Sequence, residues 1–427
     1  MAATWLMMSL EGPFLASVIA RMAEPKFNLA AYGVAFAIAL LFESPIIMIM
    51  TASTALVKNR QTYLKLRNFT YLLNVILTCF MLIGIIPVIF NFFAKEIIGL
   101  PDNIAQLTRS AIILLLPWPA AIGFRRFNYG ILISNNLTKR VAVGTVTRLL
   151  TMSSTAVLLY NYSNFHGVEV GAAALSVGVT MEAIMSKIMA LSVIKKLKLN
   201  YSGNEKLSYR GIINFYYPLA LTALISLAAQ PIVTFFLSQS REAINSLAVL
   251  PVVTALTFVF RSFGLSFQEV GIALMGENWE GYKHLRNFAI LAGSIATLFL
   301  MAIAFSPLAD IWFHTVSGLS AELTNFSKLP IKIMAIFPAL TFLIAFQRAI
   351  LVNARHTVPI TWGTVIEVSL IILILLVLIH YLNFIGVIAA TIAYVVGRIA
   401  ANTYLTFPFI RLVKKHTTVK IENQQVE

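Results

Sequence analysis

The segment Asn164-Phe165-His166-Gly167-Val168 returns 219 positions later, from 164 to 383, as Asn383-Phe384-Ile385-Gly386-Val387. Toward the N-terminus the offset becomes 218, and Phe42-Glu43-Ser44 matches Phe260-Arg261-Ser262. Further matches keep this register over most of the chain, which indicates a tandem duplication instead of a chance likeness. The sequence therefore predicts two copies of one unit.

Each copy is composed of long apolar runs. Of the 427 residues, 59% are apolar and 11% are charged, and the mean hydropathy is +0.84. A soluble domain carries roughly 25% charged residues, so this composition excludes a soluble enzyme, a nucleic-acid-binding domain and a secreted disulfide scaffold. Because about 20 apolar residues cross a bilayer, the chain yields twelve candidate spans: 2–20, 28–57, 69–93, 108–134, 141–162, 167–194, 212–238, 244–275, 288–314, 331–352, 358–381 and 384–413.

The duplication divides these spans equally. We expect an all-α membrane protein with an N-terminal six-helix half (1–194), a basic cytoplasmic linker (195–211), a C-terminal six-helix half (212–413) and a cytoplasmic tail (414–427). Since six is an even number, both copies start on the same side of the membrane and are parallel repeats about an axis along the membrane normal. Residues at matching positions are therefore expected at one depth.

The charges of the loops predict the orientation. Loops after even-numbered spans, together with the C-terminal tail, hold eighteen Lys and Arg residues, against seven on the opposite side. This positive-inside bias predicts a multi-pass protein of the inner (plasma) membrane with both termini in the cytoplasm. The net charge of +15 then reflects topology, and no nucleic-acid partner is expected.

Several charged residues lie inside the spans. Each such group costs at least ~2.5–3.5 kcal/mol at mid-membrane on insertion scales, so it needs a partner or a task. Three repeat-related positions carry opposite charges: Glu43 with Arg261, Arg148 with Glu367, and Glu182 with Arg398, the last pair three residues out of register. In one interpretation, each acid pairs with a base of its own half; in the other, Glu43 and Arg261 line a central cleft and are separated by substrate. Arg148 and Glu367, closer to the loops, are candidates for a gate or a structural ion pair.

Bases outnumber acids within the spans, by seven to five. A surplus of arginine suits phosphate or carboxylate groups, which a guanidinium binds as a bidentate fork. Arg348 aligns with Tyr129, next to Asn128, so this layer is polar in both halves. Adjacent Arg125 and Arg126 point about 100° apart on a helix, and one of them is expected to pair with Glu182 or to reach the interface.

Three motifs carry a family resemblance. They are Glu11-Gly12-Pro13-Phe14-Leu15, Asn28-Leu29-Ala30-Ala31-Tyr32-Gly33 and Gly167-Val168-Glu169-Val170-Gly171-Ala172. With the six-plus-six pattern, they resemble MATE-type exporters of the multidrug/oligosaccharidyl-lipid/polysaccharide flippase (MOP) superfamily. Locally, Tyr217-Pro218-Leu219-Ala220-Leu221 is similar to the progressive ankylosis proteins, a branch that exports anions such as pyrophosphate or citrate.

The resemblance implies a V-shaped transporter whose halves rock about a cleft lined by the first, second, seventh and eighth spans. It also implies that Glu11 is the acid that couples transport to H⁺ or Na⁺. The repeat partner of Glu11 is Ala229, and the adjacent Gln230 is a candidate substrate contact, as are Glu182, Arg348 and Arg398 in the spans. Glu269 is expected either in a gate salt bridge or in contact with substrate.

Other chemistry lacks the necessary residues. The chain contains no phosphate-binding Gly-x-x-x-x-Gly-Lys-Ser/Thr loop, its six histidines are scattered, and its single cysteine, Cys79, lies in an apolar run. Neither an enzyme nor a metal site nor a cofactor beyond a coupling ion is expected. The favoured hypothesis is a monomeric, ion-coupled exporter of a small anion, organic or pyrophosphate-like. The alternatives are a multidrug exporter driven through Glu11 and a lipid-linked sugar flippase.

Overall fold

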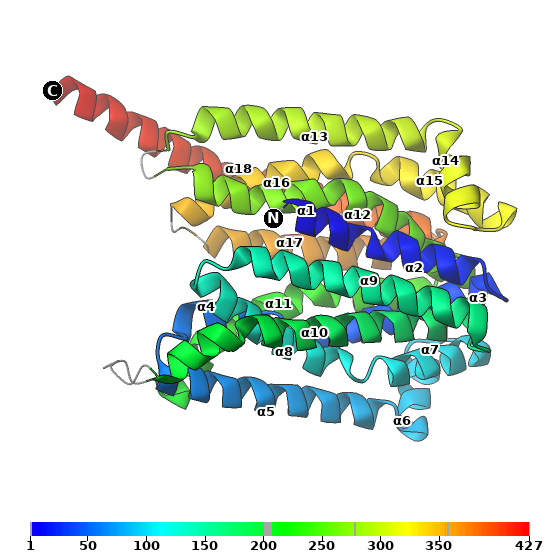
Figure 1. The fold of residues 1–427 in the computed structure, drawn as a ribbon. Coiled ribbons are helices and arrows are strands. Elements are labelled where there is room, and N and C mark those ends of the chain that lie inside the picture. Colours follow the sequence, from blue (N-terminus) through cyan, green and yellow to red (C-terminus); the bar gives the residue numbers. More distant parts are fainter. Residues whose placement is uncertain (1, 200–206, 277–278, 355, 357, 427) are drawn as a thin grey trace. The chain divides into compact units, whose positions relative to one another are not determined.

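The computed structural model describes residues 2–199, 207–276, 279–354, 356 and 358–426. These residues form helices joined by short turns, and none of them forms a strand (Figure 1). Among the described residues, eleven helices are long and apolar enough to cross a membrane, and the shorter apolar helix Leu6–Ala20 precedes them. Each of the twelve expected spans overlaps one of these segments, although several bounds are shifted, so the predicted all-α membrane bundle is confirmed.

The first six spans are interrupted where the sequence has turn-forming residues. Pro45 lies in the turn that divides the second span into α3 and α4, and Pro117 ends the turn in the fourth. Asn59 caps the third span, because its Oδ1 accepts a hydrogen bond of 2.9 Å from the Thr62 backbone N–H. The elements are α1 (Ala2–Ser9), α2 (Glu11–Ala20), α3 (Pro25–Glu43), α4 (Ile49–Leu56), α5 (Arg60–Gly84), α6 (Pro87–Asn91), the π-helical turn η1 (Phe92–Ile97), α7 (Asp102–Leu114), α8 (Trp118–Ser134), α9 (Thr138–Tyr162) and α10 (Gly167–Leu199).

The last six spans repeat some of these interruptions, but the counterpart of the divided second span is one continuous helix, Ala243–Leu274. A π-helical turn again follows the third helix of the half, and the fourth span again divides before a proline-containing first turn, here at Pro338. The elements are α11 (Tyr209–Ser238), α12 (Ala243–Leu274), α13 (Tyr282–Ala304), α14 (Leu308–Asp310), η2 (Ile311–Val316), α15 (Ala321–Met334), α16 (Phe337–Asn353), α17 (Val358–Leu375), η3 (Leu376–Tyr381) and α18 (Gly386–Val426).

Packing divides the chain at places other than the expected half boundaries. One compact unit, here the N unit, comprises Glu11–Pro251 and Ser317–Leu319; the C unit comprises Met1–Leu10, Val252–Val316 and Ser320–Glu427. The physical reason is that α11 packs on the first half: the Tyr216 hydroxyl donates to the Pro45 carbonyl oxygen. The expected linker 195–211 begins as part of α10, and its residues 200–206 lie outside the described residues.

A small residue allows a close helix contact in the N unit. A Cβ atom on Gly130 of α8 would lie 2.5 Å from the Ser53 Cβ and 2.6 Å from the Met50 carbonyl oxygen of α4. At this contact the Ser53 hydroxyl donates a 2.8 Å hydrogen bond to the carbonyl oxygen of Phe127. The short helix α4 is thereby fixed against α8, close to Arg125 and Arg126.

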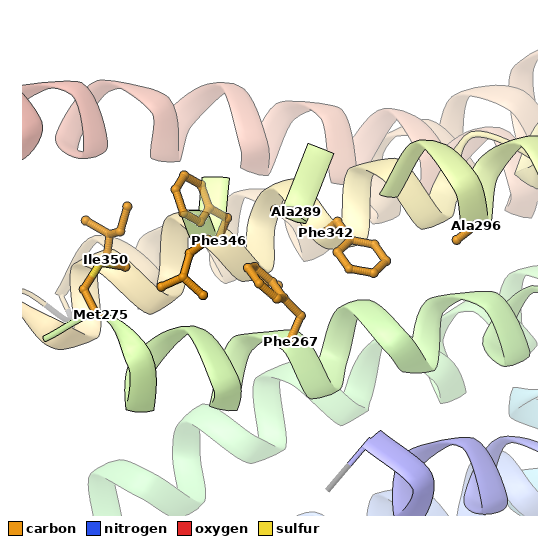
Figure 2. Close-up of a cluster of buried hydrophobic side chains, with 9 residues drawn as sticks. Phe267, Met275, Ala289, Ala296, Phe342, Phe346 and Ile350 are labelled. Carbon is orange, nitrogen blue, oxygen red and sulfur yellow. The ribbon is translucent and has the colours of Figure 1, made fainter. Parts of the chain in front are cut away.

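Aromatic side chains fill the corresponding region of the C unit (Figure 2). Phe267 of α12 packs against Phe342 and Phe346 of α16, with ring centroids 5.8 and 6.4 Å apart. Met275 and Ile350 extend this cluster along the same two helices. It fixes the rotation of α12 and α16, the helices that carry Arg261 and Arg348.

Candidate functional site

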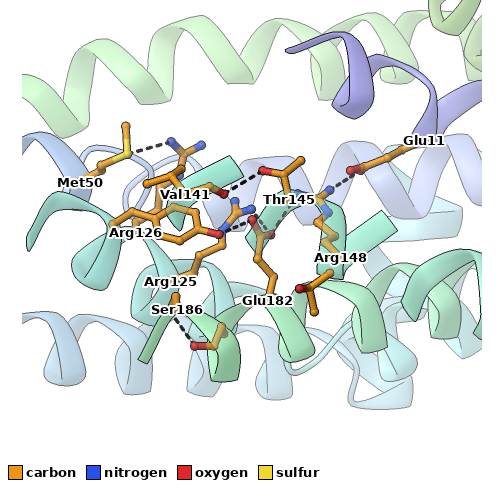
Figure 3. A network of polar contacts seen from close by, with 12 residues as sticks. Glu11, Met50, Arg125, Arg126, Val141, Thr145, Arg148, Glu182 and Ser186 are labelled. Carbon is orange, nitrogen blue, oxygen red and sulfur yellow. Dashed lines mark hydrogen bonds and ion pairs between the residues drawn. The ribbon is translucent and has the colours of Figure 1, made fainter. Parts of the chain in front are cut away.

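Four buried charged residues of the N unit form one alternating chain (Figure 3). Glu182 of α10 is paired with Arg125 of α8, and its other oxygen accepts a 2.8 Å hydrogen bond from the Tyr129 hydroxyl. Arg148 of α9 lies 3.7 Å from Glu182 Oε2 and also pairs with Glu11 of α2. Two acids thus neutralise two bases in a region of low dielectric.

The neighbouring arginines of α8 separate as the helix geometry predicts. Arg125 points to Glu182, whereas Arg126 points to the Met50 sulfur, 4.0 Å from its Nη1 (Figure 3). Within the described part of the chain, the buried Nε of Arg126 has no hydrogen-bond partner. The expected pairing of one arginine with Glu182 is therefore present.

Glu43 lies at the end of α3 and is buried. Its Oε2 accepts a hydrogen bond of 3.2 Å from the indole Nε1–H of Trp118. The Arg148 guanidinium carbon lies 5.8 Å from the centre of the same Trp118 ring. Trp118, which the sequence alone did not single out, thus contacts both an acid and a base.

Two arginines of the C unit share one aromatic ring. The guanidinium carbons of Arg261 and Arg398 lie 4.4 and 5.0 Å from the centre of the Phe337 ring. Arg261 Nε also donates to the Thr341 hydroxyl at 3.3 Å. Arg398 forms a 2.7 Å salt bridge with Glu367 of α17, whereas the described contacts of Arg261 are with neutral groups.

A third arginine of the C unit, Arg348, lies on α16. Its Nη2 donates to the Thr364 hydroxyl at 3.2 Å, and among the described residues its buried Nε has no hydrogen-bond partner. The charged residues that the sequence places inside the spans of the C unit are three arginines, Arg261, Arg348 and Arg398, and two glutamates, Glu269 and Glu367, an excess of one positive charge; of the two acids, Glu367 has a described side chain. In the N unit, three arginines are matched by Glu11, Glu43 and Glu182, and Lys187 lies over the Phe124 ring.

The repeat register explains why Glu43 of the first half is replaced by Arg261 in the second. Phe337 is 219 positions after Trp118, so each half places an aromatic residue at the start of its fourth-span helix. The Trp118 N–H needs an acceptor and is matched by Glu43, whereas Phe337 has no donor and its ring face suits the cation of Arg261. The sequence shows that Trp118 of the first half is replaced by Phe337 in the second. The effect of this replacement on the neighbouring charges can be seen only from the contacts between helices.

A second exchange concerns the fifth and sixth helices of each half. Arg148 and Glu182 approach to 3.7 Å in the N unit, and Glu367 and Arg398 to 2.7 Å in the C unit. The same pair of helices is therefore bridged twice, with the acid and the base exchanged. Each bridge joins an acid and a base of the same unit, as expected if the acids pair within their own halves.

The remaining predicted residues are placed as follows. Gln230 lies on α11, partly exposed, and its carbonyl oxygen accepts a 3.1 Å hydrogen bond from the Thr234 hydroxyl. Glu269 is outside the residues whose side chains the structure describes. Glu43 and Arg261 each contact an aromatic residue of their own unit, and their direct pairing stays a prediction.

Comparison with known proteins identifies the fold. No protein-family model matches the chain, and no curated protein sequence does. An inward-facing multidrug resistance MATE family transporter of the MOP superfamily matches with a TM-score of 0.72 and 16% identity, over 97% of this chain and 96% of that chain. An outward-facing MATE structure gives 0.67 and 16% over 97% and 94%, and the lipid II flippase MurJ, in an inward closed conformation, gives 0.69 and 14% over 98% and 91%. The chain therefore has the MATE-like fold that its motifs led us to expect.

Proposed function

We propose that this protein is a secondary active exporter that works by alternating access and carries a small anion, organic or pyrophosphate-like, across the inner membrane. In this proposal it acts as a monomer with both termini in the cytoplasm. Its fold is similar to that of transporters solved in inward-facing and outward-facing conformations, which supports a rocking mechanism.

The observation that carries the proposal is the excess of arginine in the C unit. Arg261 and Arg398 share the Phe337 ring, and one carboxylate, that of Glu367, accompanies them. A buried charge without a counter-ion is costly, so this arrangement is best accounted for by a ligand that supplies negative charge. Carboxylate and phosphate groups match the donor fork of a guanidinium.

The N unit supplies a candidate coupling site. One carboxylate oxygen of Glu11 is paired with Arg148, while the other, Oε1, is buried and has no hydrogen-bond partner among the described residues. A proton or Na⁺ bound at Oε1 would weaken the attraction between Glu11 and Arg148. Arg148 retains Glu182 at 3.7 Å, so this exchange would not leave the base isolated.

A different observation favours the second candidate, a multidrug exporter of organic cations. Tyr32 and Phe36 stack with centroids 6.1 Å apart, and Phe36 meets Trp118 edge-on at 6.5 Å. Glu43 borders this aromatic group through Trp118, and acids among aromatic rings suit cations. The third candidate, a lipid-linked sugar flippase, is supported by the likeness to MurJ.

Uptake into proteoliposomes distinguishes these candidates. The reconstituted protein would be given labelled citrate, labelled pyrophosphate or a cationic dye, each with and without an imposed H⁺ or Na⁺ gradient. The proposal predicts saturable, gradient-stimulated uptake of an anion. Saturable dye uptake that is lost in Glu11→Gln, without uptake of either anion, would instead support the multidrug exporter.

A further inference from the structure

The C unit contains a second basic site, whose lining shares no residue with the arginine cluster around Phe337. A cavity of about 280 Å³ lies where α13 ends and α15 approaches it. Its lining includes Phe305, Ser306, Asp310, Lys328 and Lys332. Phe305, Ser306 and Asp310 follow the end of one candidate span, Tyr282–Ala304, and the two lysines lie in the third and fourth turns of the next, Ala321–Asn353.

The cavity carries a net positive charge. Lys328 Nζ lies 2.7 Å from Asp310 Oδ1, so this lysine has an acidic partner. The Lys332 ammonium lies 5.6 Å from the centre of the Phe305 ring. Since Lys328 and Lys332 are four residues apart on α15, both project from the same helix face. Two lysines and one aspartate leave one positive charge for a ligand.

The surface around Lys332 is apolar and exposed. Leu329 lies three residues before Lys332 on the same face of α15, and Ile336 lies in the turn that follows α15; both are exposed. Phe305, over which the lysine lies, is 64% exposed. A lysine on a lipid-facing surface is costly unless its ammonium reaches polar groups at the interface.

The first half of the chain has no such lysine. The residue 219 positions before Lys332 is Ile113, an exposed apolar residue, as is usual for a surface that faces lipid. The counterpart of Lys328 is Arg109, whose Nε donates a 2.9 Å hydrogen bond to the Ile85 carbonyl oxygen and so satisfies the end of α5. The second half thus adds a charge where the fold alone does not need one.

We propose that this cavity binds the phosphate group of an anionic phospholipid. Lys332 and Lys328 bind the phosphate oxygens, and the acyl chains lie against Phe305, Leu329 and Ile336. The α13 helix carries Lys283 in its first turn, next to the basic loop that precedes it, and ends at this cavity. The lipid therefore belongs to the leaflet opposite the basic loops. This inference is independent of which solute the protein carries.

Native mass spectrometry of the full chain in detergent tests the site. Phosphatidylglycerol and phosphatidylcholine would be titrated separately into the wild type, Lys332→Ile and Lys283→Ile. Because a lysine near an anionic lipid surface contributes about 1 kcal/mol, Lys332→Ile is expected to bind the tightest phosphatidylglycerol about fivefold more weakly. Lys283→Ile, which removes an equal charge at the other end of α13, should match the wild type.

A second variant and a competition with inorganic phosphate test the same site. Asp310→Asn releases Lys328 from its salt bridge and is expected to tighten phosphatidylglycerol binding. Inorganic phosphate at millimolar concentration should not displace the lipid, because it lacks the acyl chains; displacement would indicate a site for free phosphate. Equal phosphatidylglycerol binding by the wild type, Lys332→Ile and Asp310→Asn would overturn the proposal.

Discussion

Arg261 and Arg398 come from different helices, α12 and α18, yet their guanidinium groups contact one ring, that of Phe337. Two like charges this close repel each other, and the ring and Glu367 offset only part of that cost. An anion bound by both arginines would remove the remainder. This relationship connects the architecture of the C unit to the solute that we propose.

The exchanged ion pairs give a first prediction. The double variant Glu367→Arg with Arg398→Glu copies into the C unit the order found for Arg148 and Glu182. Each single variant places like charges together and should lower the unfolding temperature, whereas the double variant should recover part of the loss. Thermal unfolding of the four proteins in detergent gives the coupling, and strictly additive effects would contradict the assignment of Glu367 and Arg398 as one pair.

Glu182 is expected to be the most important single charge for the stability of the N unit. Glu182→Ala removes the acid that both Arg125 and Arg148 contact, and leaving buried bases without it costs about 3–5 kcal/mol. A large drop in the unfolding temperature is therefore expected. Glu169→Ala, which removes a less buried acid of the same helix, is the control; a similar drop in both would count against the network.

Close packing at Gly130 can be tested with a matched pair of glycines. Gly130→Ala would bring a methyl group to 2.5 Å from Ser53 Cβ, and overpacking of this kind costs about 1–3 kcal/mol. Gly84→Ala adds the same methyl group where nothing lies within 4 Å. The unfolding temperature should fall in the first variant and stay unchanged or rise slightly in the second. Equal behaviour of the two variants would show that the α4–α8 contact is not tight.

Glu11 is predicted to couple transport to an ion. In Glu11→Gln the stimulation of uptake by an H⁺ or Na⁺ gradient should disappear, while exchange of labelled for unlabelled solute continues, because the C unit arginines are intact. Glu96→Gln, an exposed acid, should retain the stimulation. Retention of full gradient dependence by Glu11→Gln would assign coupling to another residue.

The sequence was sufficient for those features that depend on periodicity and register. Span positions, the duplication and the divergence of Arg125 from Arg126 all follow from helix geometry. Register also placed Glu43 level with Arg261, but the depth of a residue does not say which neighbour its side chain meets. Only the contacts between helices show that Trp118 selects an acid and Phe337 a base as its neighbour.

The sequence also did not predict the division of the chain into the N unit and the C unit. The repeat places the boundary in the linker, but Tyr216 of α11 bonds to Pro45 of the first half. Such a contact depends on helix rotation and side-chain shape, which hydropathy does not record. Duplication of a sequence therefore predicted the number of helices and their order, but not which helices pack together.

The most direct test of the central claim compares two arginine variants in the same transport measurement. Arg261→Gln removes a guanidinium from the Phe337 ring, and Arg286→Gln removes an exposed one at the start of α13. Truncating one partner of a buried charged contact costs 2–5 kcal/mol or more, so Arg261→Gln should slow the uptake of labelled citrate or pyrophosphate about thirtyfold or more. Arg286→Gln should transport like the wild type. Undiminished anion uptake by Arg261→Gln would contradict the account.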